Sequence, residues 1–150
     1  MEAVAFELNT TIDKHLPALQ FIKESEYSFK PSPIKWSKKE ILGHLIDSAQ
    51  NNIRRFIVAQ YESRPKIVYT QDKWVSITNY QDYNLPDLIS LWYLLNQHLC
   101  HLLKSLPEGM EEKECMTEES HTIKWLAQDY IKHLLHHLNQ ILNLEPVAYP

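Results

Sequence analysis

The chain has 150 residues, a length that suits one domain with a single hydrophobic core. Hydrophobic residues make up 44% of it and charged residues 23%, and its two glycines are too few for a glycine-rich phosphate loop or a turn-dense β-barrel. The net charge of −4, with no cluster of Lys or Arg, argues against nucleic acid as a partner.

The beginning of the chain lacks the basic start and the long apolar run of a signal peptide, and no stretch is long and apolar enough for a membrane span. We therefore expect a cytoplasmic protein that has no membrane partner. In that compartment the two cysteines, Cys100 and Cys115, should be reduced. Neither belongs to a CxxC pattern, and Cys100 fits core packing better than a nucleophile.

Four segments have the apolar spacing of amphipathic helices, and none has the alternation of a long strand. The first runs roughly from Val4 to Glu24, and Pro17 should kink or interrupt it. The second opens at Ser37, where Ser-Lys-Lys-Glu has the form of a capping box. It should end near Tyr61–Ser63, before Pro65.

A long connector over residues 62–84 is rich in aromatic side chains and should pack against the bundle, either lining a site or covering its end. The third helix runs roughly from Pro86 to Leu106. An acidic connector that should be solvated leads to the fourth helix, roughly Thr122 to Asn143. These segments predict an all-α, up-down four-helix bundle that forms one domain over residues 1–150, with at most a short β-hairpin.

Eight histidines are the main chemical feature, and three of them lie close together on the fourth helix, at His133, His136 and His137. Side chains three or four residues apart share a helix face, so His133/His137 and His133/His136 are both candidate metal-binding pairs. A helical wheel places His133 and His137 at the edge of the apolar stripe and His136 almost opposite the core. We choose His133 and His137 and expect His136 to face solvent.

A metal site usually takes three protein ligands, so the third should come from another helix. His44, early in the second helix, lies off the apolar stripe, which fits either a histidine in a polar cleft or one on the surface. His98 and His101 on the third helix are its rivals, but His101 points away from the apolar stripe, so we expect both to be structural or exposed. His15 and His121 have no visible partner.

Three polar residues each lie about one helical turn from one of these histidines: Asp47, Asp129 and Gln140. A metal-binding imidazole usually donates its second ring N–H to a neighbouring acceptor, which fixes the orientation of the ring. Each of the three is a candidate for that role, and each is equally consistent with a solvated polar side chain.

Residues 36–48, WSKKEILGHLIDS, and residues 122–141, TIKWLAQDYIKHLLHHLNQI, closely resemble the second and the last helix of the DinB-like family. The resemblance covers nearly the whole chain. Members of that family are four-helix bundles with three histidines around a divalent metal, often nickel or zinc. One histidine lies on the second helix and two, four residues apart, lie on the last. The resemblance therefore implies that His44, His133 and His137 are the metal ligands.

The resemblance also implies two chemistries for a small-molecule substrate. Some relatives are similar to transferases that activate a low-molecular-weight thiol, such as bacillithiol or mycothiol, and others are described as metal-dependent hydrolases. In both, a three-histidine site with an open position acts as a Lewis acid. We expect thiol transfer to an electrophilic molecule, with hydrolysis or a non-catalytic metal-binding module of a stress response as alternatives. A homodimer is compatible with a bundle of this size, although no sequence feature requires one.

Overall fold

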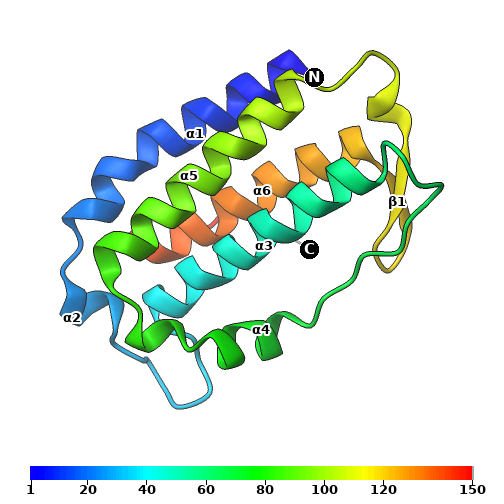
Figure 1. Ribbon diagram of the computed structural model, residues 1–150. Coiled ribbons are helices and arrows are strands. Elements are labelled where there is room, and N and C mark those ends of the chain that lie inside the picture. Colours follow the sequence, from blue (N-terminus) through cyan, green and yellow to red (C-terminus); the bar gives the residue numbers. More distant parts are fainter. Residues whose placement is uncertain (150) are drawn as a thin grey trace.

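Four long helices lie side by side in the computed structural model, which describes residues 1–149 (Figure 1). The all-α four-helix bundle that the sequence predicts is confirmed. The long helices are α1 (Glu2–Phe21), α3 (Lys38–Val58), α5 (Leu85–Lys104) and α6 (Ile123–Leu142). The connections contain α2 (Glu24–Tyr27), α4 (Gln71–Thr78), the 3-10 turns η1 (Tyr80–Asp82) and η2 (Met110–Glu112), and the strands β1 (Glu114–Met116) and β2 (Ser120–Thr122).

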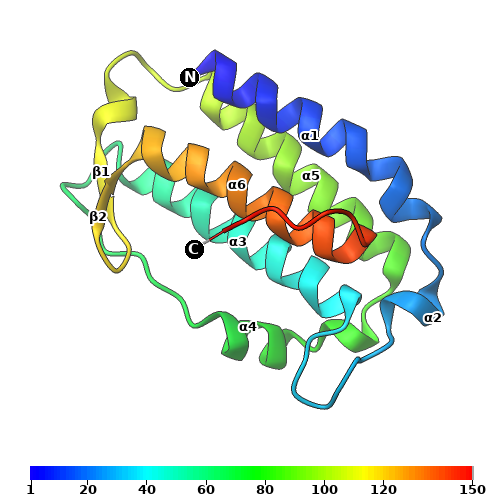
Figure 2. The same ribbon diagram turned by 180° about the vertical axis from the view of Figure 1, so that it is seen from behind.

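The helices form a ring in which α5 packs against α1 and α3, and α6 packs against α3 and α1. In both views α1 and α6 run in one direction and α3 and α5 in the other (Figures 1 and 2). Successive long helices therefore alternate in direction except at α3 and α5, because residues 59–84 carry the chain back along the outside of the bundle. This leaves α3 and α6 antiparallel and in contact, so their facing side chains can build one site.

Short-range signals set the ends of the two helices that matter most. At the start of α3, the Ser37 hydroxyl accepts the Glu40 amide N–H at 3.1 Å, and the Glu40 carboxylate accepts the Ser37 amide N–H at 2.7 Å. In α6, the Thr122 hydroxyl accepts the Trp125 amide N–H at 3.1 Å, and Asn143 ends the helix in the left-handed region with φ 54°. These caps fix where α3 and α6 begin and end, and therefore which face of each helix carries its histidines.

Both long connectors are ordered parts of the fold. The first buries Ile67, Val75 and Tyr80, which confirms that it packs against the bundle. The second forms an antiparallel β1–β2 hairpin instead of a fully solvated loop, because Cys115 is buried within it and only its tip is exposed. The Ile67 amide N–H donates to the Met116 carbonyl at 2.9 Å and joins the two connectors.

Three further expectations can be compared with the described residues. Helix α1 continues through Pro17 without interruption, so the proline does not divide it. Cys100 and Cys115 are both buried and free. Within residues 1–149, no helix combines the length and the apolarity that crossing a bilayer requires.

Candidate metal centre

Three histidine rings from two helices meet between α3 and α6. One ring nitrogen from each of His44, His133 and His137 lies within 4.8 Å of the other two, and the Nε2 atoms of His44 and His133 are 3.0 Å apart. The ring centroids are 4.6 to 5.0 Å apart and the ring planes are inclined at 78 to 80°. The structure therefore brings together the three histidines chosen from the sequence.

Local packing explains how α3 presents His44. A Cβ on the preceding residue, Gly43, would lie 2.1 Å from Cδ2 of Tyr80, so only glycine lets the tyrosine ring lie flat against the helix. The Tyr80 hydroxyl then donates to Oδ1 of Asp47 at 2.5 Å, and the Trp36 ring lies 5.1 Å from that of His44. His44 is consequently 1% exposed and held between aromatic rings.

Burial keeps all three imidazoles neutral. It lowers the pKa of His44 to about 3 and that of His133 to about 2, and in both cases repulsion from neighbouring histidines adds to the effect. Burial also lowers the pKa of His137. A neutral imidazole has a lone pair on one nitrogen, which is the form that binds a metal ion.

A chain of hydrogen bonds fixes which nitrogen of His137 carries that lone pair. The Val147 carbonyl can only accept, so Nδ1 of His136 donates to it at 2.7 Å. Nε2 of His136 then accepts from the Gln140 amide nitrogen at 2.9 Å, which turns the Gln140 oxygen toward His137. Nδ1 of His137 donates to that oxygen at 2.8 Å, and its Nε2 keeps the lone pair.

These hydrogen bonds test two of the expectations about α6. Gln140 does accept the second ring N–H of a site histidine, as one of the alternatives proposed. The expectation that His136 faces solvent is wrong: its ring is half-buried beneath the segment that follows α6, and both of its nitrogens are hydrogen-bonded. A helical wheel describes an isolated helix and cannot show a segment that folds back over it.

The two candidate aspartates do not orient an imidazole. Asp47 accepts the Tyr80 hydroxyl, and Asp129 accepts the Tyr149 hydroxyl at 2.9 Å. The Tyr149 ring also lies edge-on to that of His133, with centroids 5.2 Å apart. Tyr149 was not anticipated, because it lies in a segment without any helical period that could have placed it.

The converging ring nitrogens of the site fit a metal ion. Nδ1 of His44 and Nδ1 of His133 are buried and have no hydrogen-bond partner within residues 1–149, although buried polar atoms normally have one. The Nε2 atoms of the same two rings face each other at 3.0 Å. Three neutral imidazoles that converge in this way form a usual donor set for zinc and for other divalent transition metals.

The remaining histidines lie apart from this cluster. His98 and His101 are exposed on α5, and His15 is buried on α1. His121, for which the sequence showed no partner, stacks on Trp125 with ring centroids 3.7 Å apart and planes 10° apart. Because His121 lies in β2 and Trp125 lies in the first turn of α6, no helical spacing relates the two residues.

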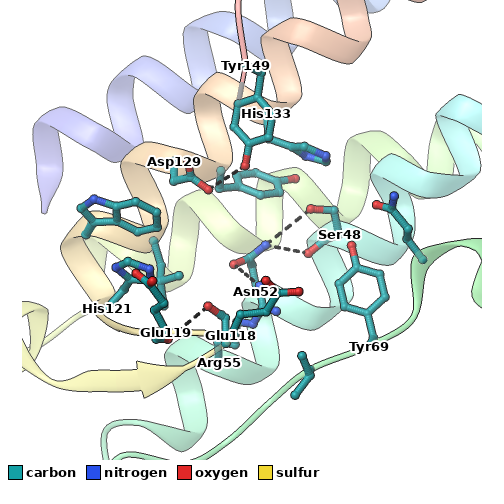
Figure 3. Close-up of a pocket in the computed structure, with 16 residues that line it drawn as sticks. Ser48, Asn52, Arg55, Tyr69, Glu118, Glu119, His121, Asp129, His133 and Tyr149 are labelled. Carbon is teal, nitrogen blue, oxygen red and sulfur yellow. Dashed lines mark hydrogen bonds between the residues drawn. The ribbon is translucent and has the colours of Figure 1, made fainter.

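A groove of about 480 Å³ extends from the cluster along α3 and α6 (Figure 3). His133, Tyr149 and Asp129 lie at one end of it, and Arg55 and His121 lie toward the other. Its volume falls in the range of small-molecule sites. A small molecule in this groove would contact one of the three clustered histidines directly.

Comparisons with known proteins give the same fold. A model of the DinB superfamily matches residues 7–141. Two proteins provisionally named metal-dependent hydrolases, from Oceanobacillus iheyensis and Bacillus mycoides, are each 32% identical to this chain over 115 and 114 residues. Each match covers 73% of this chain but 64% of the relative, so the chain spans less than two thirds of these curated relatives.

A solved structure extends the comparison to three dimensions. YfiT from Bacillus subtilis, described as a probable metal-dependent hydrolase with an unusual four-helix bundle topology, superposes with a TM-score of 0.82. The two sequences are 20% identical, and the match covers 94% of this chain and 83% of YfiT. At that identity the likeness concerns the fold alone.

Proposed function

The chain belongs to the DinB superfamily, and from that premise we propose that it is a metal-dependent enzyme in which His44, His133 and His137 hold one divalent ion, zinc or nickel. The convergence of three neutral imidazole nitrogens within 4.8 Å is the observation that supports this most directly. The provisional names of the two curated relatives agree with it. When bound, such an ion supplies Lewis acidity and lowers the pKa of a ligand at its open position.

The protein's own residues have distinct parts in this proposal. His44, His133 and His137 bind the ion, and Gln140 orients His137. The Tyr149 ring lies against one side of His133, and its hydroxyl donates to Asp129. Because His133 also lines the groove, a small-molecule substrate bound there lies beside the site.

The reaction we favour is transfer of a low-molecular-weight thiol to an electrophilic small molecule. A thiol that is deprotonated by coordination needs no separate general base.

The thiol has to come from a second substrate. Burial raises the pKa of Cys100 to about 11, and burial also raises the pKa of Cys115. Both thiols lie in the core of the fold, where they are neither ionised nor accessible to a substrate. A free low-molecular-weight thiol is therefore part of the proposal.

Metal-dependent hydrolysis is the second candidate. The names of the curated relatives favour it, and so does the Asp129–Tyr149 pair in the groove beside His133, which offers groups able to exchange a proton. The two reactions differ in one requirement: turnover by a transferase depends on an added thiol, and turnover by a hydrolase does not.

The test begins with metal analysis of protein purified without a histidine tag. We expect close to one zinc or nickel ion per chain, and loss of that ion in His137→Ala. Electrophilic substrates should then be screened with and without an added thiol, bacillithiol and mycothiol included. Protein that binds no divalent metal would contradict the proposal. Metal binding without turnover in either screen would indicate a non-catalytic metal-binding module.

A further inference from the structure

A stripe of polar side chains leads along α3 away from the histidine cluster. His44, Ser48, Asn52 and Arg55 are spaced so that they share one face of the helix. Ser48 and Asn52 are only 4% and 5% exposed, although both are polar, and they line the groove together with Arg55. The rise from His44 to Arg55 is roughly 16 Å at the usual helical spacing.

Arg55 lies at the far end of this stripe, and no carboxylate of the described residues contacts its guanidinium group. Its Nε and Nη2 donate to the Ile67 carbonyl at 3.2 and 3.1 Å, and its Nη1 lies 3.4 Å from Oδ1 of Asn52. All of these acceptors are neutral. Among the salt bridges of residues 1–149 none involves Arg55, so no carboxylate oxygen lies within 4.0 Å of its guanidinium nitrogens. Two of its five N–H groups remain for a ligand.

The acidic residues of the groove do not provide the missing partner. Asp129 accepts the hydroxyl of Tyr149, and Glu118 and Glu119 are exposed at the tip of the β1–β2 hairpin, at the rim of the groove. Burial lowers the pKa of Arg55, and nearby acidic groups, Asp129 among them, oppose this only in part because no carboxylate in the described part of the chain lies in contact with the guanidinium group. An arginine in that environment favours a carboxylate, sulfonate or phosphate group of a ligand.

The groove between the two ends has an aromatic lining. Tyr130 is buried in its wall, Trp125 is stacked with His121, and the Tyr69 ring centroid lies 6.0 Å from the guanidinium carbon of Arg55 (Figure 3). Such surfaces suit an apolar or unsaturated segment of a ligand. The groove therefore has a histidine at one end, the polar side chains of α3 and several aromatic rings between the ends, and a cation toward the other end.

From this arrangement we propose that the groove binds an elongated organic anion whose charged group pairs with Arg55 while its other end lies at His133. The inference deepens the function proposed above, because it rests on a metal site at His44, His133 and His137. It narrows the substrate class to molecules in which an acidic group and the reacting group are separated by an extended segment.

The probe is a series of dicarboxylic acids in which one end has been converted to a hydroxamate, from succinate to sebacate. The hydroxamate binds zinc, and the free carboxylate is available to Arg55. The controls are the same hydroxamates with a primary amide at the far end. Dissociation constants are measured by calorimetry on zinc-loaded protein, after zinc binding itself has been measured.

We expect the carboxylate series to bind roughly 10- to 100-fold more tightly than the amide series, as for a hydrogen-bonded charged pair. The preference should be greatest at one intermediate chain length, because the two ends of the groove are a fixed distance apart. Arg55→Gln should remove it without changing zinc affinity. Arg54→Gln, an adjacent and exposed arginine with the same charge, should retain it.

Two outcomes separate this inference from the proposed function. If zinc binds but wild-type protein shows no preference for the carboxylate, or if Arg55→Gln retains that preference, the groove proposal is wrong and the metal site remains. If zinc does not bind, the proposed function fails first. The wild-type ligand comparison needs no variant, so it remains decisive even if Arg55→Gln does not fold.

Discussion

The two halves of the bundle differ in whether their buried polar atoms have hydrogen-bond partners. In the α1–α5 half, Nδ1 of the buried His15 is hydrogen-bonded to the carbonyl of Thr11, one turn earlier in its own helix, at 2.7 Å. Asn96 donates to the Trp92 carbonyl at 2.8 Å and accepts from the Tyr130 hydroxyl at 2.6 Å. Each of these polar side chains has the partner that a stable core requires.

In the α3–α6 half, three buried polar atoms close to the histidine cluster lack such a partner among the described residues. Nδ1 of His44, Nδ1 of His133 and Oδ2 of Asp47 are buried and unpaired within residues 1–149, whereas the other half has one comparable atom, the indole nitrogen of Trp92. An unsatisfied buried polar group costs about 1–3 kcal/mol. These unpaired atoms are concentrated beside the histidine cluster, so the two halves should respond differently to mutation.

The largest expected difference concerns the three clustered histidines. His44→Ala, His133→Ala and His137→Ala should each weaken zinc or nickel binding by more than about 100-fold, which exceeds the usual effect of losing a residue that only orients a ligand. The bundle should remain folded, because the apolar core is unchanged. Competition titration against a chelating dye measures the affinity. His98→Ala, on the exposed face of α5, is the matched control.

The fold was predictable from local patterns because most of its determinants are local. The capping box at Ser37 and the caps at Thr122 and Asn143 fixed α3 and α6 to within a few residues. Helix α4 was not predicted, because eight residues are too short to show a period and burial of Val75 depends on the rest of the bundle. The shared direction of α3 and α5 likewise depends on where the long connector packs.

The site was predictable only in part for the same reason. Spacing on one helix selected His133 and His137, but His44 depended on the resemblance to a known family, because no local pattern relates α3 to α6. His136 was misjudged and Tyr149 was missed, since both depend on the segment after α6 folding back over the helix. Contacts between segments distant in sequence are what periodicity cannot show.

The response to pH should also divide the two halves. The pKa of His44 falls from 6.5 to about 3 on folding, so between these values the unfolded chain binds a proton that the folded protein excludes. The stability of the metal-free protein should therefore decrease as pH falls from about 6.5 toward 3. Asp47 opposes this: burial raises its pKa from 3.8 to about 6, so its own contribution is lost as pH rises through that range.

The lowered pKa of His133 and His137 has the same sign as that of His44, so the histidines should determine the net slope. The prediction is tested by measuring the midpoint of urea unfolding across this pH range, in the presence of a chelator that keeps the protein metal-free. His44→Asn should flatten the slope, and His98→Asn should not. A slope that is unchanged in His44→Asn would show that the site histidines do not control acid sensitivity.

A smaller effect is expected at Gln140, which orients His137 without being a ligand. Gln140→Leu should weaken metal binding by about 10- to 100-fold, the usual range for such a partner. His136→Ala should weaken it less, because His136 acts only by holding the Gln140 amide in its orientation. Gln128→Leu, at an exposed position of the same helix, is the control. Full affinity in Gln140→Leu would mean that helix geometry alone positions His137.

The smallest effect on metal binding, and the sharpest test of the comparison, is expected at His15. His15→Ala removes a buried side chain and its hydrogen bond to Thr11, so it should lower the free energy of unfolding by about 1–3 kcal/mol and leave metal affinity unchanged. His133→Leu should instead abolish metal binding without lowering the free energy of unfolding of the metal-free protein. The substitution replaces an unpaired buried nitrogen with an apolar side chain of similar size. Its stability should match or exceed that of the wild type, and added zinc should no longer raise it. Urea unfolding of both variants with and without zinc tests this double dissociation. Equal destabilisation of the two metal-free variants would show that the histidines of α6 support the fold as His15 does, and the distinction between the two halves would then be lost.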